Sequence, residues 1–159
     1  MIHGTSTFIH VGQIHIDTAP ASISTVLGSC VAVCLFDRAL GIGGMNHYLL
    51  PFWNGNGLQS AKFGNISIPK LVELMLTQGS SSRSIEAKIF GGAAMHSGGS
   101  DLMRIGQKNI LVAKEILSDY RIPVIAEDVG GTMGRKIQLD LANGKVLLKY
   151  TVSNQEKKE

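Results

Sequence analysis

The stretch that decides the fold runs from Leu27 to Pro51 and reads LGSCVAVCLFDRALGIGGMNHYLLP. Val31, Val33 and Leu35 alternate with Ala32, Cys34 and Phe36, which is the period-2 pattern of a β-strand. Residues 37–41 interrupt the pattern, and residues 42–50 form the expected return strand. We therefore predict a β-hairpin, with a cysteine near the start of one strand and a histidine on the other.

The register of this hairpin decides whether the two polar side chains meet. If Arg38 and Ala39 form a two-residue loop, Cys30 stands directly opposite His47. Directly opposed side chains share a face of the sheet, with Cβ atoms about 4.5–5.5 Å apart, so a thiol and an imidazole can interact. A loop one residue longer makes the pair diagonal and keeps it within reach of a side chain as long as histidine.

A cysteine beside a histidine predicts nucleophilic catalysis. The imidazole of His47 can take the proton of the Cys30 thiol and leave a thiolate–imidazolium pair. The thiolate can attack an amide carbonyl, the imidazolium can protonate the leaving nitrogen, and the neutral imidazole can then activate water. The structural alternative is that the cysteine is a small buried hydrophobe and the histidine an ordinary structural residue.

Neighbouring residues supply candidates for the supporting roles. Gly28 and Ser29 precede the candidate nucleophile and leave room for backbone N–H groups to approach a developing oxyanion. A hydroxyl upstream, on Ser24 or Thr25, can orient the imidazole as a third member. No metal and no organic cofactor is required by this chemistry, so none is predicted.

Length and composition limit the class of protein. The chain has 159 residues, 44% of them hydrophobic, which predicts one domain over residues 1–159. The net charge of +3 is spread over scattered side chains, which does not indicate nucleic-acid binding. No apolar stretch is long enough to span a membrane, and the N-terminus lacks the pattern of a signal peptide, so we expect a cytoplasmic protein. The two cysteines are too far apart along one strand to form a disulfide with each other, which also fits a reducing compartment.

Patterns along the rest of the chain predict two main helices and several more strands. A helix is expected over residues 67–78, with Ser67 as its N-cap and Pro69 in its first turn, and a second helix over residues 105–120. The pair Asn143–Gly144 predicts a second hairpin. The other expected strands cover residues 7–17, 23–27, 87–90 and 124–128, and residues 1–6 and 153–159 are expected to be frayed ends.

A glycine pair, Gly91 and Gly92, ends one of these strands. No Gly-Lys-Ser or Gly-Lys-Thr follows it, so a phosphate-binding loop is not indicated. The pair predicts instead that the backbone passes close to another part of the molecule. His96, in the loop that follows, is a fallback base if the hairpin register is wrong.

Several motifs together resemble the CheD family, the chemoreceptor glutamine deamidases of bacterial and archaeal chemotaxis. Three parts of the hairpin are similar to the family signature. They are Leu27–Val31 (L-G-S-C-V), Asp37 at the end of the first strand, and His47, which is followed closely by Leu50–Pro51. Further matching segments, in the right order, are Ala87–Ala93, Ile105–Asn109, Ile122–Pro123 and Asp128–Arg135.

The resemblance implies a cysteine-dependent amidohydrolase that converts receptor glutamine side chains to glutamate and releases ammonia. It implies Cys30 as nucleophile and His47 as acid and base, with Gly91 and Gly92 lining the glutamine pocket. The family's third catalytic residue is a threonine six positions before the cysteine; here that position is Ser24, and Thr25 follows it. The implied fold is α+β: stacked mixed β-sheets with two main helices on one side, an α/β/β layered sandwich similar to toxin-like cysteine deamidases.

The resemblance also implies partners, and it leaves rivals open. The implied partners are the cytoplasmic helices of methyl-accepting chemoreceptors and the CheC phosphatase. One rival is a chemotaxis adaptor that binds receptors or CheC with little catalysis of its own. Another is a different thiol enzyme, such as a peptidase or an acyltransferase. Methylesterase activity on receptor glutamyl esters would use the same acyl intermediate and is a side reaction that the deamidase chemistry allows.

Overall fold

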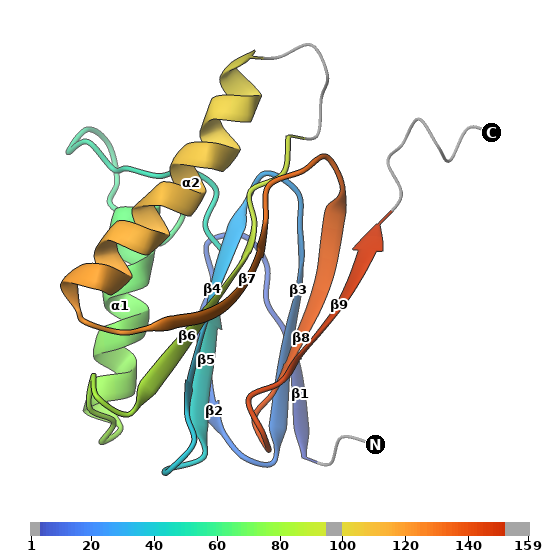
Figure 1. Cartoon of the computed structure of the whole chain (residues 1–159). Helices are drawn as coiled ribbons and strands as arrows, with labels where there is room; N and C mark the ends of the chain where they lie inside the picture. Colours follow the sequence, from blue (N-terminus) through green and yellow to red (C-terminus); the bar gives the residue numbers. More distant parts are fainter. Residues whose placement is uncertain (1–3, 95–99, 152–159) are drawn as a thin grey trace.

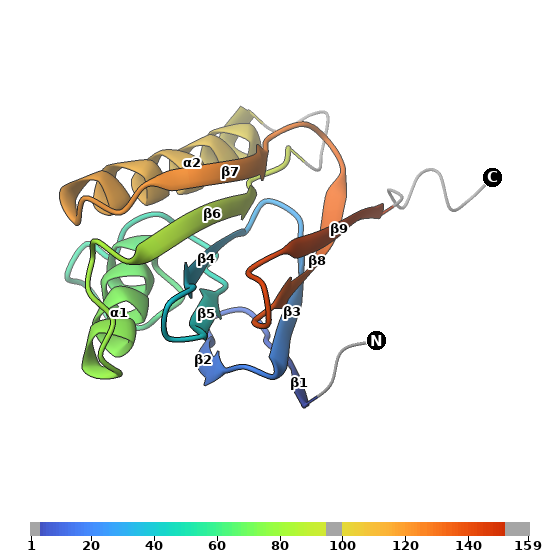
Figure 2. The ribbon, with the colours of Figure 1, turned by 60° about the horizontal axis from the view of Figure 1, so that its bottom comes forward.

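Two β-sheets stack face to face, and two helices cover the outer face of the larger sheet, as the computed structural model shows (Figures 1 and 2). The structure describes residues 4–94 and 100–151. The smaller sheet has the strand order β1-β3-β8-β9 and the larger one β2-β5-β4-β6-β7. The strands are β1 (Thr5–Phe8), β2 (Ile14–Thr18), β3 (Ala21–Leu27), β4 (Val31–Asp37), β5 (Ile42–Asn46), β6 (Ile85–Gly91), β7 (Val124–Val129), β8 (Gly134–Asp140) and β9 (Val146–Thr151). The helices are α1 (Gly64–Thr77) and α2 (Ser100–Asp119).

Both sheets mix parallel and antiparallel pairs. In the smaller sheet β1 and β3 are parallel while β8 and β9 are antiparallel, and in the larger sheet only the β6–β7 pair is parallel. The α/β/β sandwich with two helices on one side is therefore confirmed. The likeness to toxin-like deamidases stays a prediction.

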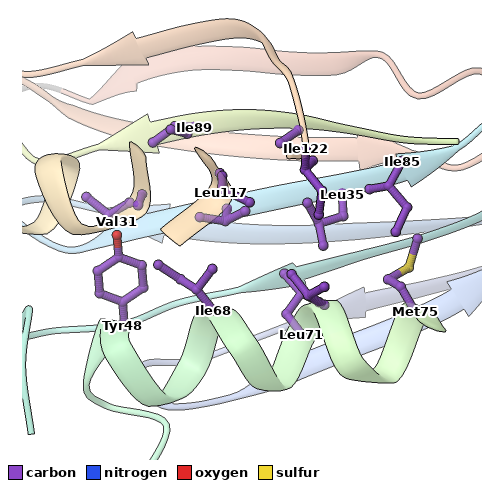
Figure 3. Close-up of a cluster of buried hydrophobic side chains, with 14 of the residues drawn as sticks. Val31, Leu35, Tyr48, Ile68, Leu71, Met75, Ile85, Ile89, Leu117 and Ile122 are labelled. Carbon is purple, nitrogen blue, oxygen red and sulfur yellow. The ribbon is translucent and has the colours of Figure 1, made fainter. Parts of the chain in front are cut away.

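The central strand β4 is buried along its whole length because both of its faces are covered. On one face its side chains join those of α1 and α2 in an apolar cluster (Figure 3). There Ile68, Leu71 and Met75 project from one side of α1 toward the sheet. On the other face, its alternate residues pack against the smaller sheet in a second cluster. Each fully buried aliphatic side chain stabilises the fold by roughly 1.5–3 kcal/mol.

The N-terminal segment differs from the sequence prediction. Residues 7–17 form not one strand but parts of two, because the chain turns between β1 and β2 and enters the other sheet. The expected frayed segment 1–6 is also wrong in part, since β1 begins at Thr5. Residues 1–3 and the predicted tail 153–159 lie outside the described residues.

Helix α1 begins three residues earlier than predicted. Ser67 is not its N-cap: the N-cap is Phe63, which makes no side-chain capping bond, and Ser67 is buried inside the helix. The first free N–H groups, of Gly64 and Asn65, instead donate to the carbonyls of Leu50 and Pro51 at 2.8 and 3.0 Å. The start of the helix is thus set by a distant segment of backbone, which a local capping pattern does not reveal.

The remaining elements lie where the sequence predicted them, with some bounds shifted: the return strand expected over residues 42–50 is β5, which ends at Asn46. Helix α2 begins earlier than expected, at Ser100, and ends at Asp119. The hairpin of β8 and β9 turns at Asn143–Gly144 as predicted, with Gly144 at a φ of +76°. No helix of the described chain combines the length and apolar character that crossing a membrane requires.

Candidate active site

A three-residue link, Gly28 to Cys30, carries the chain from β3 in the smaller sheet to β4 in the larger one. This crossing places Cys30 at one end of the layer between the two sheets. Its side chain is half-buried and packs against the apolar cluster of that layer. The candidate nucleophile therefore stands at a junction of the two sheets, where residues from both can surround it.

The hairpin loop that leads to His47 has four residues, 38–41, rather than the two that we predicted. The ladder pairs Asp37 with Ile42, which shifts the register of the whole hairpin. Asp37 folds the loop: its carbonyl accepts from the Gly41 N–H at 2.9 Å and its Oδ1 accepts from the Leu40 N–H at 3.2 Å. Gly41 has a φ of +64°, a conformation that favours glycine.

The new register makes Cys30 and His47 a diagonal pair. The isolated bridge between Val31 and Tyr48 keeps the same register, so His47 lies opposite Ala32, two residues along from Cys30. Among the described residues no hydrogen bond joins the thiol to the imidazole. The prediction of direct opposition is wrong, while a diagonal arrangement still lies within reach of long side chains.

The two side chains nevertheless lie on the same face of the sheet, as predicted. Val31 and Tyr48 both contribute to the cluster on the helix side. Because side chains alternate along a strand, their neighbours Cys30 and His47 point the other way, into the layer between the sheets. There Cys30 packs against the second cluster, and His47 meets a residue of β3.

That residue is Thr25. Its Oγ1 lies 2.7 Å from Nδ1 of His47 and 2.8 Å from the carbonyl oxygen of Ile9, and the threonine is completely buried. A hydroxyl has a single proton, and the carbonyl can only accept, so Thr25 donates to Ile9 and accepts from His47. Nδ1 of His47 therefore carries the proton. The lone pair of the neutral imidazole is left on Nε2, which is the atom a general base needs.

Ser24, the other candidate for the third position, is not brought to the imidazole. It lies on the opposite face of β3 from Thr25, in the row of Ser22 and Val26. The sequence held a signal for this distinction: Ile23 and Leu27 flank Thr25 at period 2, and both belong to the core between the sheets. The signal was ambiguous, because the row of Ser22 and Ser24 also contains an apolar residue, Val26.

Burial sets the charge state of the pair. It raises the pKa of the Cys30 thiol to about 11, although the residue's own backbone N–H acts in the opposite direction. It also lowers the pKa of His47 to about 4, and the nearby His10 adds to this effect. At neutral pH the thiol is protonated and the imidazole is neutral. From these shifts we expect no preformed thiolate in the free site, so attack requires transfer of the thiol proton to His47.

Gly91 and Gly92 press against the backbone of the nucleophile, as the glycine pair predicted. A Cβ on Gly91 would lie 2.2 Å from the carbonyl oxygen of Cys30, and the N–H of Gly92 donates to that oxygen at 2.9 Å. Both glycines have positive φ, at 104° and 72°. They fix the main chain of Cys30 from the side of β6. Their role in lining a glutamine pocket stays a prediction.

The turn before the nucleophile leaves backbone donors unused. The carbonyl of Gly28 accepts from the N–H of Ala93 at 3.0 Å. The N–H groups of Ser29 and Cys30 donate to no other residue's backbone or side chain within 4–94 and 100–151. Free N–H groups beside a nucleophile can stabilise an oxyanion.

Residues that the sequence did not single out hold this site from outside. The segment between β1 and β2 supplies the Ile9 carbonyl, and Gly12 of the same segment donates its N–H to the His47 carbonyl at 2.7 Å. The buried Arg135 pairs with Asp128 at 2.8 Å and donates to the Gly130 carbonyl at 2.9 Å, and the Gly130 N–H in turn donates to the Gly91 carbonyl at 2.9 Å. All these partners are main-chain groups or tertiary contacts, which leave no local pattern in sequence. His96, the fallback base, lies outside the described residues.

A family model and the sequences of curated relatives indicate the same family. The family model described as "CheD chemotactic sensory transduction" matches residues 49–150, a span that begins just after His47. A relative from Sulfurimonas denitrificans, named probable chemoreceptor glutamine deamidase CheD, is 51% identical over 90% of this chain and 92% of its own length. Relatives with the same printed name in Trichlorobacter lovleyi and Methanococcus maripaludis are 47% and 37% identical, each over 89% of this chain and over 88% and 92% of their own lengths. The chain belongs to the CheD family.

Proposed function

We propose that this chain is a chemoreceptor glutamine deamidase, in which Cys30 is the nucleophile, His47 the general base and acid, and Thr25 the residue that orients the imidazole. The family and the names of its relatives support the reaction. The single observation that supports these roles is the hydrogen-bonded chain from His47 through Thr25 to the Ile9 carbonyl. It leaves Nε2 of a neutral imidazole free to accept a proton.

The reaction begins with attack of the Cys30 sulfur on the side-chain carbonyl carbon of a glutamine, while the thiol proton moves to Nε2 of His47. The sulfur–carbon bond forms, and the carbonyl oxygen becomes an oxyanion. The imidazolium then gives its proton to the departing nitrogen, so the carbon–nitrogen bond breaks, ammonia leaves and a thioester remains.

Water completes the turnover. Neutral His47 takes a proton from the water as it attacks the thioester, and the sulfur leaves and recovers the proton. The products are glutamate and the original thiol. Because burial disfavours each isolated charge, the thiolate and imidazolium form together, each stabilising the other.

The oxyanion needs donors that are fixed before the reaction starts. We assign this role to the N–H groups of Ser29 and Cys30, which donate to no other residue in the described part of the chain, while Gly28 supplies the room for the turn. In this arrangement Gly91 and Gly92 hold the Cys30 carbonyl, and with it the N–H groups of the turn, at a fixed position.

The substrates in this proposal are glutamines on the cytoplasmic helices of methyl-accepting chemoreceptors, and the site of action is the cytoplasm. Binding to the CheC phosphatase, which membership of the family implies, belongs to the same proposal. A pull-down of purified CheC by the purified chain tests the second partner independently of catalysis.

The decisive experiment replaces each cysteine in turn. Cys30→Ala should abolish ammonia release from a receptor cytoplasmic fragment and the mass gain of deamidation. Cys34→Ala is the matched control, because Cys34 is the other cysteine, lies four residues further on within β4, and is buried in the apolar cluster between the sheets. It should keep the activity of the unmodified chain.

Retention of full activity by a folded Cys30→Ala variant would contradict the mechanism. If instead the unmodified chain binds the receptor fragment but neither ammonia nor a mass change appears, the chain acts as an adaptor and the deamidase proposal fails.

A further inference from the structure

A buried asparagine of α2 joins the segment that carries the nucleophile to the segment that carries the base. Nδ2 of Asn109 donates to the carbonyl of Ser29 at 3.1 Å and to the carbonyl of Leu49 at 3.0 Å. Ser29 directly precedes Cys30, and Leu49 lies two residues after His47. One side chain therefore spans both catalytic segments from the helix side of the sheet.

The donors of this amide, rather than its packing, explain its presence. Asn109 is completely buried, and its two N–H groups are both used. Its Oδ1 is also buried, and it has no hydrogen-bond partner among the described residues. A buried acceptor without a partner costs free energy, so an asparagine here is unfavourable unless its two donors are needed.

The regular pairing of the two segments is interrupted close to this point. The continuous ladder between β4 and β5 ends at Cys34 and Met45, and beyond it only the bridge between Val31 and Tyr48 remains. Between these points the Val33 N–H donates to the side chain of Asn46, not to the opposite backbone. Val31 and Tyr48 exchange two backbone hydrogen bonds, at 3.0 and 3.1 Å, but this pair is separated from the continuous ladder, so Asn109 adds a second link beside it.

Helix α2 reinforces this link through its main chain. The hydroxyl of Tyr48, the residue after His47, donates to the backbone carbonyl of Asn109. Asn109 thus contacts the catalytic segments at three points: at Ser29, at Tyr48 and at Leu49.

We propose that Asn109 is a positioning residue, whose two N–H groups fix the separation of Cys30 and His47 for transfer of the thiol proton. The role in turnover rests on the proposed function, whereas the geometric role does not. Misplacement of a catalytic group by about 1 Å can lower the rate about 10²-fold. The expected consequence of losing these donors is a lower kcat with little change in KM.

The test compares two variants of the same helix. Asn109→Ala removes both donors. Leu117→Ala is the control, because Leu117 is fully buried two turns further along α2 and removes packing but no hydrogen bond. Normalised to folded protein, Asn109→Ala should lose about 10²-fold in kcat with KM unchanged within about twofold. Leu117→Ala should keep kcat within about twofold, although it lowers the melting temperature more.

A second measurement separates this inference from the deamidase proposal. Alkylation of Cys30 by iodoacetamide needs no glutamine substrate, and Asn109→Ala should slow it at neutral pH while Leu117→Ala does not. If the unmodified chain releases no ammonia but this difference is found, the positioning role stands and the proposed function fails. If both variants react alike, the positioning role is wrong.

Asn109→Asp covers the case in which alanine prevents folding. Between two carbonyl oxygens a buried carboxylate is disfavoured, and its protonated form recovers one donor. Its activity and alkylation rate relative to the unmodified chain should rise from about pH 8 to about pH 6. A ratio that stays flat with pH, or a rise in KM at constant kcat, overturns the proposal.

Discussion

The two faces of the central sheet show how one stretch of chain serves two purposes. Toward the helices, Val31, Val33 and Leu35 enter a cluster of mainly apolar side chains. Toward the smaller sheet, the alternate residues lead to a polar arrangement at one end, where Thr25 meets His47. The first face stabilises the fold, and the second carries the candidate chemistry.

The difference teaches that a site of this kind depends on three segments meeting across two sheets. The apolar positions of the helix-side layer accept other apolar side chains of similar volume, because apolar contact has no direction. The site between the sheets depends on which atom carries a proton, so it requires Thr25, His47 and the Ile9 carbonyl at defined distances. Substitutions of the apolar helix-side residues and of the site residues should therefore separate stability from activity.

The largest expected effect is on the site face. His47→Gln removes the general base but keeps a side chain of similar size, so kcat/KM for receptor deamidation should fall about 10²–10⁴-fold. The melting temperature should change little. A variant that retains more than about a tenth of the activity would show that another group takes the thiol proton.

The second-largest expected effect is a loss of stability from a substitution on the helix-side face. Leu71→Ala in α1 leaves a cavity in the fully buried apolar cluster and should lower the free energy of unfolding by about 2–5 kcal/mol. Chemical denaturation measures this loss. The activity of the folded fraction should stay within about twofold; a large loss in kcat would show that the two faces are coupled.

A smaller effect on activity is expected from substitution of Thr25 in β3, and none from substitution of its neighbour Ser24. Thr25→Val keeps the shape but leaves the His47 Nδ1–H and the Ile9 carbonyl unpaired, so activity should fall about 10–100-fold. Thr25→Ser retains the hydroxyl and should recover most of the activity. Ser24→Ala, on the other face of the same strand, should behave like the unmodified chain in the same assay.

The smallest expected effect is a shift of the acidic limb of the kcat/KM profile toward lower pH. Protonated His47 cannot accept the thiol proton, and its pKa is lowered to about 4, so kcat/KM should hold on acidification and fall only near about pH 4. The lowered pKa of His47 also makes the stability of the fold depend on pH. The unfolded chain binds this proton from about pH 6.5 downward while the folded chain resists it, so stability decreases between about pH 6.5 and about pH 4.

Circular dichroism at each pH provides the control, because activity must be referred to the protein that remains folded. Iodoacetamide should alkylate Cys30 with a rate that still rises with pH toward about 11. A plateau near neutral pH would show that the free site already contains the thiolate.

Local patterns predicted much of the fold. The hairpin at Asn143–Gly144, both main helices and the same-face placement of Cys30 and His47 are confirmed, because glycine conformations and hydrophobic periods are properties of short segments. The predicted start of α1 and the single strand predicted over residues 7–17 were wrong. The start of α1 and the turn between β1 and β2 are both set by hydrogen bonds to segments far away in the sequence.

By itself, the sequence determined the family, the α+β class and the residue types of the site, since these follow from motifs and from alternating side chains. Only the tertiary structure decided that Thr25 rather than Ser24 meets His47, and that Asn109 spans both catalytic segments. The physical reason is the same in both cases. A hydrogen bond depends on atoms within about 3 Å of each other, and here they come from elements that only packing of the two sheets and α2 brings together.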